Sequence, residues 1–111
     1  MTTGAERDPD FLQRVDELIA SLTEQFDDFD PDELEAETSE GVLKLTFADG
    51  TRCVLNRQAA ANQVWLAEGA QAWHFEFQET VGWVDTKGRG ELRQVLSDVL
   101  ENKLGRPTKL I

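Results

Sequence analysis

The sequence predicts an α+β fold, a two-layer α-β sandwich with an N-terminal and a C-terminal helix on one face of an antiparallel sheet. Helical periodicity appears near both ends of the chain, and strand alternation fills the region between them. The length of 111 residues suits one domain that can bury a core without disulfides or a structural metal. We therefore expect a single domain over residues 1–111, with its core at about 9–104 and one sheet face open to solvent.

Apolar residues near the N-terminus recur at the i, i+3, i+4, i+7 spacing of one buried helix face. They are Phe11, Leu12, Val15, Leu18, Ile19, Leu22 and Phe26. Asp8 can cap this helix, with Pro9 at the first helical position.

Four acids fall on the opposite side of the same helix, and we call them the acidic ridge: Glu17, Glu24, Asp27 and Asp28. Glu24 and Asp28 are like charges at i, i+4, which costs roughly 0.2–0.5 kcal/mol. Asp27 and Asp28 also lie at the helix C-terminus, where the helix dipole disfavours anions. Such local penalties are expected at functional sites, although a solvated acidic face is the alternative.

Residues 33–38 alternate with the period of a strand that has one wet face. The inward set is Leu34, Ala36 and Thr38, and the outward set is Glu33, Glu35 and Glu37. If this strand lies beside the end of the first helix, its acids extend the acidic ridge with oxygen ligands, which suit calcium, magnesium, manganese or iron. An open row of this kind would bind with a Kd of ~10⁻⁵ M or weaker. Protection of an edge strand from aggregation is the alternative explanation.

Residues 42–56 predict a hairpin, for which two registers are possible. A two-residue turn at Asp49-Gly50 would pair Phe47 with Arg52 and mix apolar with polar residues on one face. A three-residue loop with Gly50 in the left-handed conformation aligns apolar residues across the strands instead. We predict this second register, with the pairs Leu43–Leu55, Leu45–Cys53 and Phe47–Thr51.

Two further strands are predicted around Gln63–Ala67 and Trp73–Phe77, then a short one near Trp83-Val84 and a helix from about Gly90 to Leu104. The residues expected to point inward are Val64, Leu66, Trp73, Phe75 and Phe77, and those expected to point outward are Gln63, Trp65, His74 and Glu76. An outward Trp65 with Asn56 nearby has the composition of a protein-binding hot spot. A Trp covered by a neighbouring side chain is the alternative.

The net charge of −11 is concentrated in the N-terminal third. Up to Gly41 the chain has 14 acids and two bases, so the remainder carries a net charge of +1. This charge argues against nucleic acid and anionic membranes as partners and favours a cation or a basic protein. The single cysteine, the acidic N-terminus without an apolar leader and the lack of a long apolar run lead us to expect a cytoplasmic protein.

The sequence offers no convincing catalytic group. Ser21, Ser39 and Ser97 have no His close in the pattern, and Cys53 is expected to point inward. The carboxylates would need burial in a cleft to act as an acid and base pair, and we expect them to be solvated. A binding protein is therefore favoured over an enzyme.

An acidic helix ending in FDDFD is followed by three further stretches, GVLKLTFADG, NRQ at Asn56–Gln58 and NQVWLA at Asn62–Ala67. Together they resemble the bacterial frataxin family over roughly Phe11 to Lys103. The spacing of NRQ to QVWL is the specific part of this pattern, because acidic helices alone are common. One departure is Thr23-Glu24, where bacterial members often have two adjacent acids.

The resemblance implies a protein that holds iron(II) or iron(III) weakly and docks on the cysteine desulfurase and scaffold protein of iron–sulfur cluster assembly, as a regulator or an iron donor. The implied metal ligands are Glu24, Asp27, Asp28, Asp30, Glu33, Glu35 and Glu37, with Glu17 as a helical neighbour. The implied partner contacts are Asn56, Gln58, Gln63 and Trp65, with His74 at a position where the family tends to have a polar contact residue. We expect a monomer and leave open iron-induced oligomers and a ligand role for His74.

Two alternatives from other classes remain. A ferroxidase would oxidise iron(II) collected on the acids, although the sequence lacks the Glu-x-x-His pairs of a buried di-iron centre. An acidic docking module would clamp a basic protein without metal, and its binding would collapse with salt alone.

Overall fold

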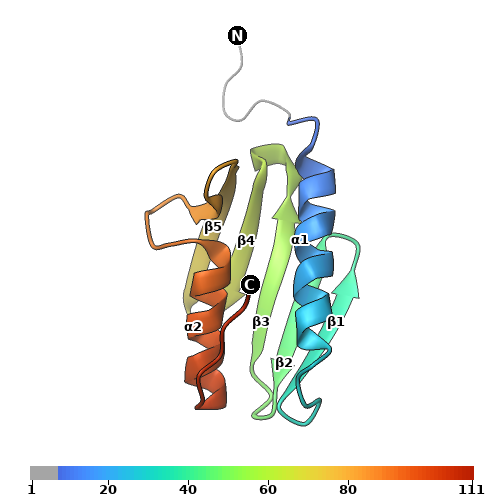
Figure 1. Cartoon of the computed structure of the whole chain (residues 1–111), viewed down its shortest axis with the longest axis vertical. Coiled ribbons are helices and arrows are strands. Elements are labelled where there is room, and N and C mark those ends of the chain that lie inside the picture. Colours follow the sequence, from blue (N-terminus) through green and yellow to red (C-terminus); the bar gives the residue numbers. More distant parts are fainter. Residues whose placement is uncertain (1–7) are drawn as a thin grey trace.

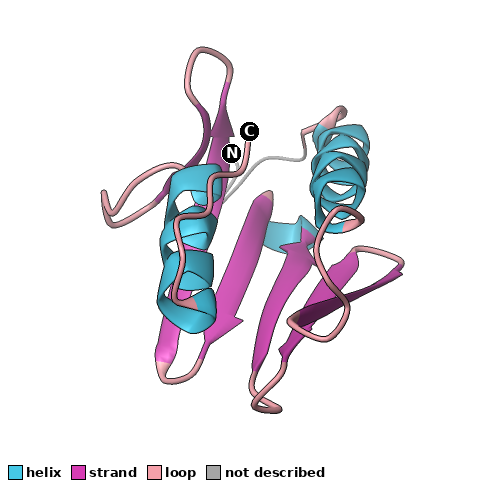
Figure 2. Ribbon diagram, turned by 60° about the horizontal axis from the view of Figure 1, so that its bottom comes forward, coloured by secondary structure: helices cyan, strands magenta, loops and turns pink. Residues whose placement is uncertain are grey.

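The computed structural model describes residues 8–111. Its elements are α1 (Phe11–Phe26), β1 (Leu34–Ser39), β2 (Val42–Phe47), β3 (Arg52–Gln58), the 3₁₀ turn η1 (Ala59–Ala61), β4 (Gln63–Glu68), β5 (Gln71–Gln78), β6 (Gly82–Asp85) and α2 (Leu92–Leu104). The six strands form one antiparallel sheet in chain order, with β1 at one edge and β6 at the other. Both helices lie on the same face of the sheet, as predicted (Figures 1 and 2).

The helix α1 begins two residues later than predicted. The Asp8 carboxylate accepts a hydrogen bond from the Asp10 backbone N–H (2.9 Å), and the Asp8 carbonyl accepts one from Phe11 (3.1 Å). These bonds close a turn before the helix, so Pro9 precedes it. The expectation that Leu12 is buried was also wrong, since this side chain is 51% exposed. Leu12 borders an open hollow whose lining across from the helix is Ala59, Ala60 and Asn62, so no large apolar side chain of that segment covers it.

The strand β1 has the predicted position and alternation, but its inward face is mostly not buried. Only Leu34 is buried, while Ala36 and Thr38 are exposed. Leu34 lies opposite Phe47 in the register with β2, where the sheet is covered. Farther along, β1 is an edge strand, and the space between its inner face and α1 is an open groove lined by residues that include Thr38.

The hairpin of β2 and β3 has the predicted register. Leu43 pairs with Leu55, and Leu45 pairs with Cys53. The Phe47 backbone N–H donates to Thr51 (2.9 Å), and Gly50 has a φ of +86°, the left-handed conformation that a three-residue loop requires. Cross-strand apolar pairing on the helix-covered face therefore selected this register.

The later elements also follow the predicted pattern. Val64, Leu66, Trp73 and Phe75 are buried, whereas Phe77 is only partly buried near the end of β5, in edge-to-face contact with Trp83. The helix α2 begins at Leu92, and its N-terminus is capped by the Glu91 carboxylate, which accepts a hydrogen bond from the Arg93 backbone N–H (2.8 Å). It ends at Leu104, as predicted, with Gly105 as its C-cap. Neither helix in the described part of the chain is long and apolar enough to cross a bilayer.

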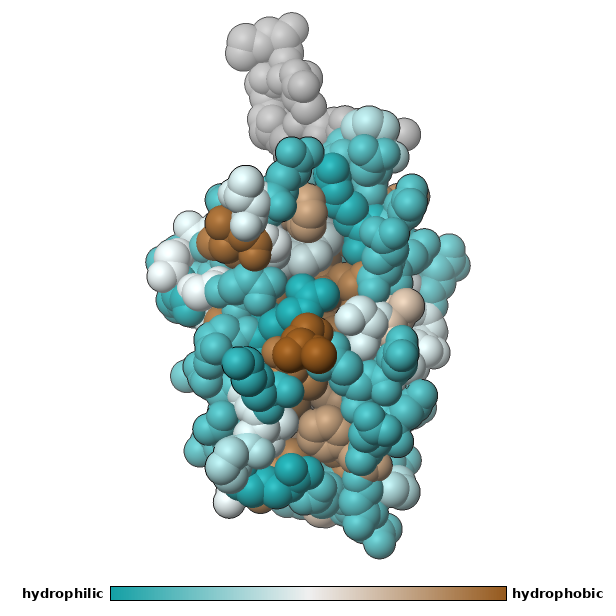
Figure 3. Space-filling model, in the orientation of Figure 1, coloured by the Kyte–Doolittle hydropathy of each residue, from teal (hydrophilic) through white to brown (hydrophobic). Residues whose placement is uncertain are grey.

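The segment 105–111 turns back after α2 and runs along the helices (Figure 1). Thr108 and Leu110 are buried in it. The helix-bearing face is mostly hydrophilic, with one hydrophobic patch near its centre, between the two helices, and another at its upper left (Figure 3). This segment was not anticipated from the sequence.

Candidate functional site

An open groove of about 470 Å³ lies between α1 and the turn that joins β1 to β2. Four carboxylates line it, which we call the groove acids: Asp16, Glu24, Asp27 and Glu40. On α1, positions 16, 20, 23, 24 and 27 share one side because they are three or four residues apart. Ala20 and Thr23 are small, so the helix leaves room between the acids.

The Thr23 hydroxyl does not add a ligand directed into this groove. It donates a hydrogen bond to the Ile19 carbonyl of its own helix (2.7 Å). The position where the resemblance leads one to expect an additional acid is thus occupied by a side chain bonded to its own backbone.

The structure brings together only part of the predicted acidic ridge. Glu24 and Asp27 lie in the groove, and Asp28 is exposed at the end of α1. Glu17 is exposed too, but it borders a different hollow, lined also by Arg14 and Arg93. The predicted metal ligands on α1 therefore face two sides of the helix.

The acids of β1 point away from the groove. Glu35 lies opposite Thr46 and Glu37 opposite Lys44, both of which are on the open face of the sheet. Glu37 also forms an ion pair with Lys44 (3.5 Å). The expectation that the strand extends the acidic ridge was therefore wrong for these two side chains, because strand alternation directs them to the other face.

Asp30 and Glu33 have partners of their own. The Asp30 carboxylate accepts a hydrogen bond from the Asp32 backbone N–H (2.9 Å), as in a turn that an aspartate stabilises. Glu33 forms an ion pair with Arg106 (2.8 Å). The hydrogen bonds from Arg106 hold the pKa of the Glu33 carboxyl below its ordinary value.

Two groove acids were missed from the sequence, Asp16 and Glu40. The helical spacing 16, 20, 23, 27 could have placed Asp16 on the same side of α1 as Asp27. No local signal identifies Glu40, because its position depends on how the β1–β2 turn folds toward α1.

The donor set suits a hard or borderline cation, since every acid in the groove offers oxygen. The geometry is open: within residues 8–111 no three His, Cys, Asp or Glu side chains lie close enough to form a metal site. A cation in the groove would therefore draw exposed side chains together on binding, which lowers its affinity.

The predicted partner residues form a second surface on the open sheet face. Trp65 stacks on His74, with ring centroids 4.1 Å apart and planes at 10°. The Trp65 indole N–H donates to Gln63 (2.8 Å), and Gln63 donates to Glu76 (3.0 Å). Asn56 lies opposite Trp65 in the strand register. Trp65 is thus only half-buried and held in place by its neighbours, so both sequence-based expectations hold in part.

Gln58 and His74 complete this surface, which we call the Trp65 face: Asn56, Gln58, Gln63, Trp65 and His74. Gln58 lies opposite Gln63, and its amide donates to Asn56 (3.4 Å). His74 is on β5, which is separated from the acids of β1 by β2, β3 and β4. At ~4.8 Å per strand, a shared metal with those acids is out of reach for its side chain.

Cys53 is buried between the sheet and the helices. Burial, with a smaller effect from Glu68, raises the pKa of the Cys53 thiol to about 12. A thiol of this kind remains protonated near neutral pH, so Cys53 is a core residue rather than a nucleophile or a metal ligand.

The fold and these surfaces define a small acidic α-β sandwich protein with an oxygen-lined groove and a preorganised aromatic face. The chain belongs to the frataxin-like family, because the family model for the frataxin-like domain matches residues 5–106. It is 35% identical over 105 residues to the iron-sulfur cluster assembly protein CyaY of Bordetella parapertussis, with 91% of this chain and 94% of that protein covered.

Solved structures agree on the fold. Frataxin from Psychromonas ingrahamii superposes with a TM-score of 0.83 at 23% identity, over 94% of this chain and 97% of that one. Trimeric frataxin from Saccharomyces cerevisiae, whose structure contains ferrous iron, gives a TM-score of 0.66 at 24% identity, over 96% of this chain and 92% of that one.

Proposed function

We propose that this protein binds iron on its acidic surface and serves iron–sulfur cluster assembly in the cytoplasm, as an iron donor or an iron-responsive regulator. The similarity to a protein named for iron–sulfur cluster assembly supports the process. The yeast frataxin complexed with ferrous iron supports the metal. Its partners would be the cysteine desulfurase and the scaffold protein of that process.

The groove acids carry this proposal. Four carboxylates from α1 and the β1–β2 turn border one open groove, so a cation in the groove is attracted by those nearest to it. The groove is exposed, so the ion keeps part of its water shell and exchanges readily. We expect a Kd of ~10⁻⁵ M or weaker, which fits a protein that passes iron on rather than storing it.

Titration with iron(II) without oxygen, followed by amide NMR, tests this proposal. Paramagnetic broadening should begin at the backbone amides around Asp16, Asp27 and Glu40. The amides of residues 86–90, which join β6 to α2, are the internal control. Uniform broadening over the whole chain, or none, would contradict iron binding in the groove.

The Trp65 face is the proposed contact with the assembly proteins. Its hydrogen bonds and ring stacking hold Trp65 in one orientation before binding, which reduces the entropy lost in a complex. Large, partly exposed aromatic side chains of this kind often dominate the binding energy of an interface.

Replacing Trp65 with Ala should weaken binding to a purified desulfurase–scaffold complex by about 30-fold, the loss typical of a hot spot. Iron(II) affinity should stay unchanged, because Trp65 lies outside the groove. Calorimetric titration measures both. Val81→Ala, at a side chain that is 57% exposed on the β5–β6 turn, is the matched apolar control. If the Trp65 variant and the wild type bind the desulfurase–scaffold complex with equal affinity, the Trp65 face is not the contact surface.

A further inference from the structure

The segment 105–111 is tied to both helices. The Leu110 backbone N–H donates to the Ser97 hydroxyl of α2 (2.9 Å), and the Leu110 side chain is 5% exposed. Gln25 of α1 bonds both backbone groups of Ile111: it accepts from the N–H (2.8 Å) and donates to the carbonyl (2.6 Å). These hydrogen bonds hold the segment against α1 and α2, and exchange of the Leu110 and Ile111 amides would show when they break.

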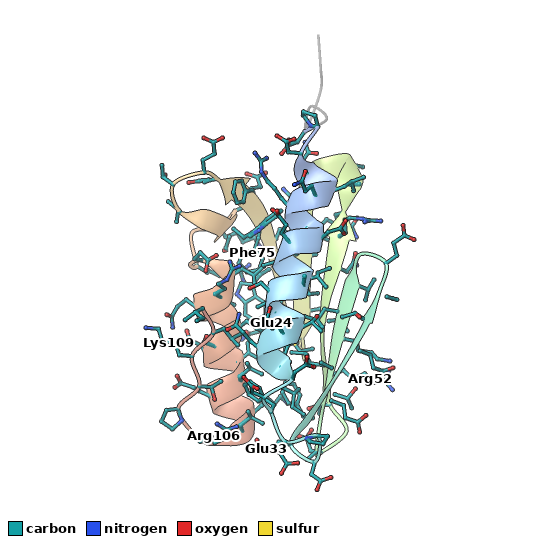
Figure 4. All side chains as sticks on the ribbon, turned by 45° about the vertical axis from the view of Figure 1, so that its right-hand side comes forward. Glu24, Glu33, Arg52, Phe75, Arg106 and Lys109 are labelled. Atoms are coloured by element: carbon teal, nitrogen blue, oxygen red, sulfur yellow. The ribbon has the colours of Figure 1, made fainter. Side chains whose placement is uncertain are left out.

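Arg106 joins the same segment to the start of β1. Its Nη2 donates to Glu33 Oε1 (2.8 Å) and its Nε to Oε2 (3.2 Å), so one guanidinium engages both carboxylate oxygens. The guanidinium also lies over the Phe29 ring, 5.6 Å from its centroid. Figure 4 shows Arg106 beside Glu33, with Lys109 directed elsewhere.

The Arg106 guanidinium therefore already occupies the Glu33 carboxylate, which would otherwise be available to a metal ion. A two-point Arg–carboxylate contact uses the edge of the carboxylate that a chelated cation would need, and the guanidinium charge repels a second cation. Next to it, Asp32 and Glu35 border a small hollow beside Ala48, whose N–H bonds the Glu33 carbonyl. Neither acid forms an ion pair within residues 8–111, so the attraction for cations persists there.

We propose that the segment 105–111 is a latch that competes with cations for Glu33, with Arg106 as its internal counter-ion. A cation that takes Glu33 displaces Arg106 and loosens the segment, and closure of the segment disfavours the cation. The two effects are reciprocal because they are one coupling between two sites. This inference rests on the proposed iron binding, and it concerns a cation contact at Glu33, outside the groove, that adds to the contacts of the groove acids.

Three variants test the latch. Arg106→Gln removes the counter-ion, Arg106→Lys keeps the charge but loses the two-point contact, and Lys109→Gln makes the same change of charge on the same segment. Lys109 is exposed and forms no ion pair in the described part of the chain. Iron(II) affinity is measured by calorimetry without oxygen, and hydrogen–deuterium exchange follows the Leu110 and Ile111 amides.

Because the ion pair is partly exposed, Arg106→Gln should raise iron(II) affinity by about two- to five-fold. Arg106→Lys should give a smaller gain, and Lys109→Gln should leave affinity nearly unchanged. In the wild type, iron(II) should speed exchange of the Leu110 and Ile111 amides. In Arg106→Gln these amides should exchange faster than in the wild type even without iron, and iron(II) should change their exchange rate little.

Two results would overturn the latch and leave the proposed function standing: iron binding with no change in the exchange of the segment, or equal gains from Arg106→Gln and Lys109→Gln. The second result would mean that the gain in iron(II) affinity comes only from the change in net charge. If the wild type and all variants fail to bind iron, the latch and the proposed function fall together.

Discussion

Replacing Glu24, Asp27 and Asp28 together with Gln, Asn and Asn should weaken iron(II) binding by about tenfold or more, because cation affinity depends on the number of charged ligands. The same variant should unfold at a temperature about 2–4 °C higher. All three acids are exposed, Glu24 and Asp28 repel each other, and Asp27 is at the C-terminal end of α1. Calorimetry measures the first effect and thermal unfolding the second.

A matched variant separates a local site from general charge. Glu79, Asp98 and Glu101 are exposed acids outside the groove, and their combined replacement with Gln, Asn and Gln changes the net charge equally. This control should bind iron(II) nearly as tightly as the wild type. An equal loss in both triple variants would mean that Glu24, Asp27 and Asp28 have no special role in iron binding. A lower melting temperature of the Glu24/Asp27/Asp28 variant would show that these acids stabilise the fold.

Replacing Asp85 with Asn should lower the free energy of unfolding by about 2–3 kcal/mol, less than for a fully buried ion pair because Arg89 is partly exposed. The Asp85 side chain is 0% exposed and forms an ion pair with Arg89 (2.8 Å). It also accepts hydrogen bonds from the backbone N–H groups of Lys87 (3.2 Å) and Arg89 (3.0 Å). Asparagine would place an amide N–H₂ group against the guanidinium or leave a buried donor unpaired. Urea unfolding measures the change.

The effect of Asp85 should depend on pH in a defined direction. Hydrogen bonds from Arg89 hold the pKa of the Asp85 carboxyl below its ordinary value, although burial opposes them. The carboxylate therefore stabilises the fold fully above its unfolded pKa of about 4, and this contribution is lost as the pH falls through the lower folded value. The stability difference between the wild type and Asp85→Asn should thus be constant from pH 5 to 7 and shrink below about pH 4.

Asp98→Asn provides the comparison, because Asp98 is exposed on α2. Its effect on stability should be small at every pH. A difference between the wild type and Asp85→Asn that persists unchanged to pH 2 would show that the carboxylate charge is not what stabilises the 85–90 loop.

The sequence was most informative where a pattern is local. The alternation of Leu43 and Leu45 opposite Cys53 and Leu55 predicted the hairpin register, because each side chain's face follows from its neighbours along the chain. The same reasoning placed Trp65 and His74 on the open face. It failed at Leu12, where burial depends on what another part of the chain places above the helix.

The sequence by itself determined the two-layer fold and the register of the β2–β3 hairpin. Only the tertiary structure decided which acids meet. It places Glu40 across one groove from Asp16 and Asp27 on α1, and it pairs Glu33 with Arg106, 73 residues away. Periodicity reports the orientation of a side chain within its helix or strand. Its partners depend on how helices, strands and the 105–111 segment pack together, which no local pattern encodes.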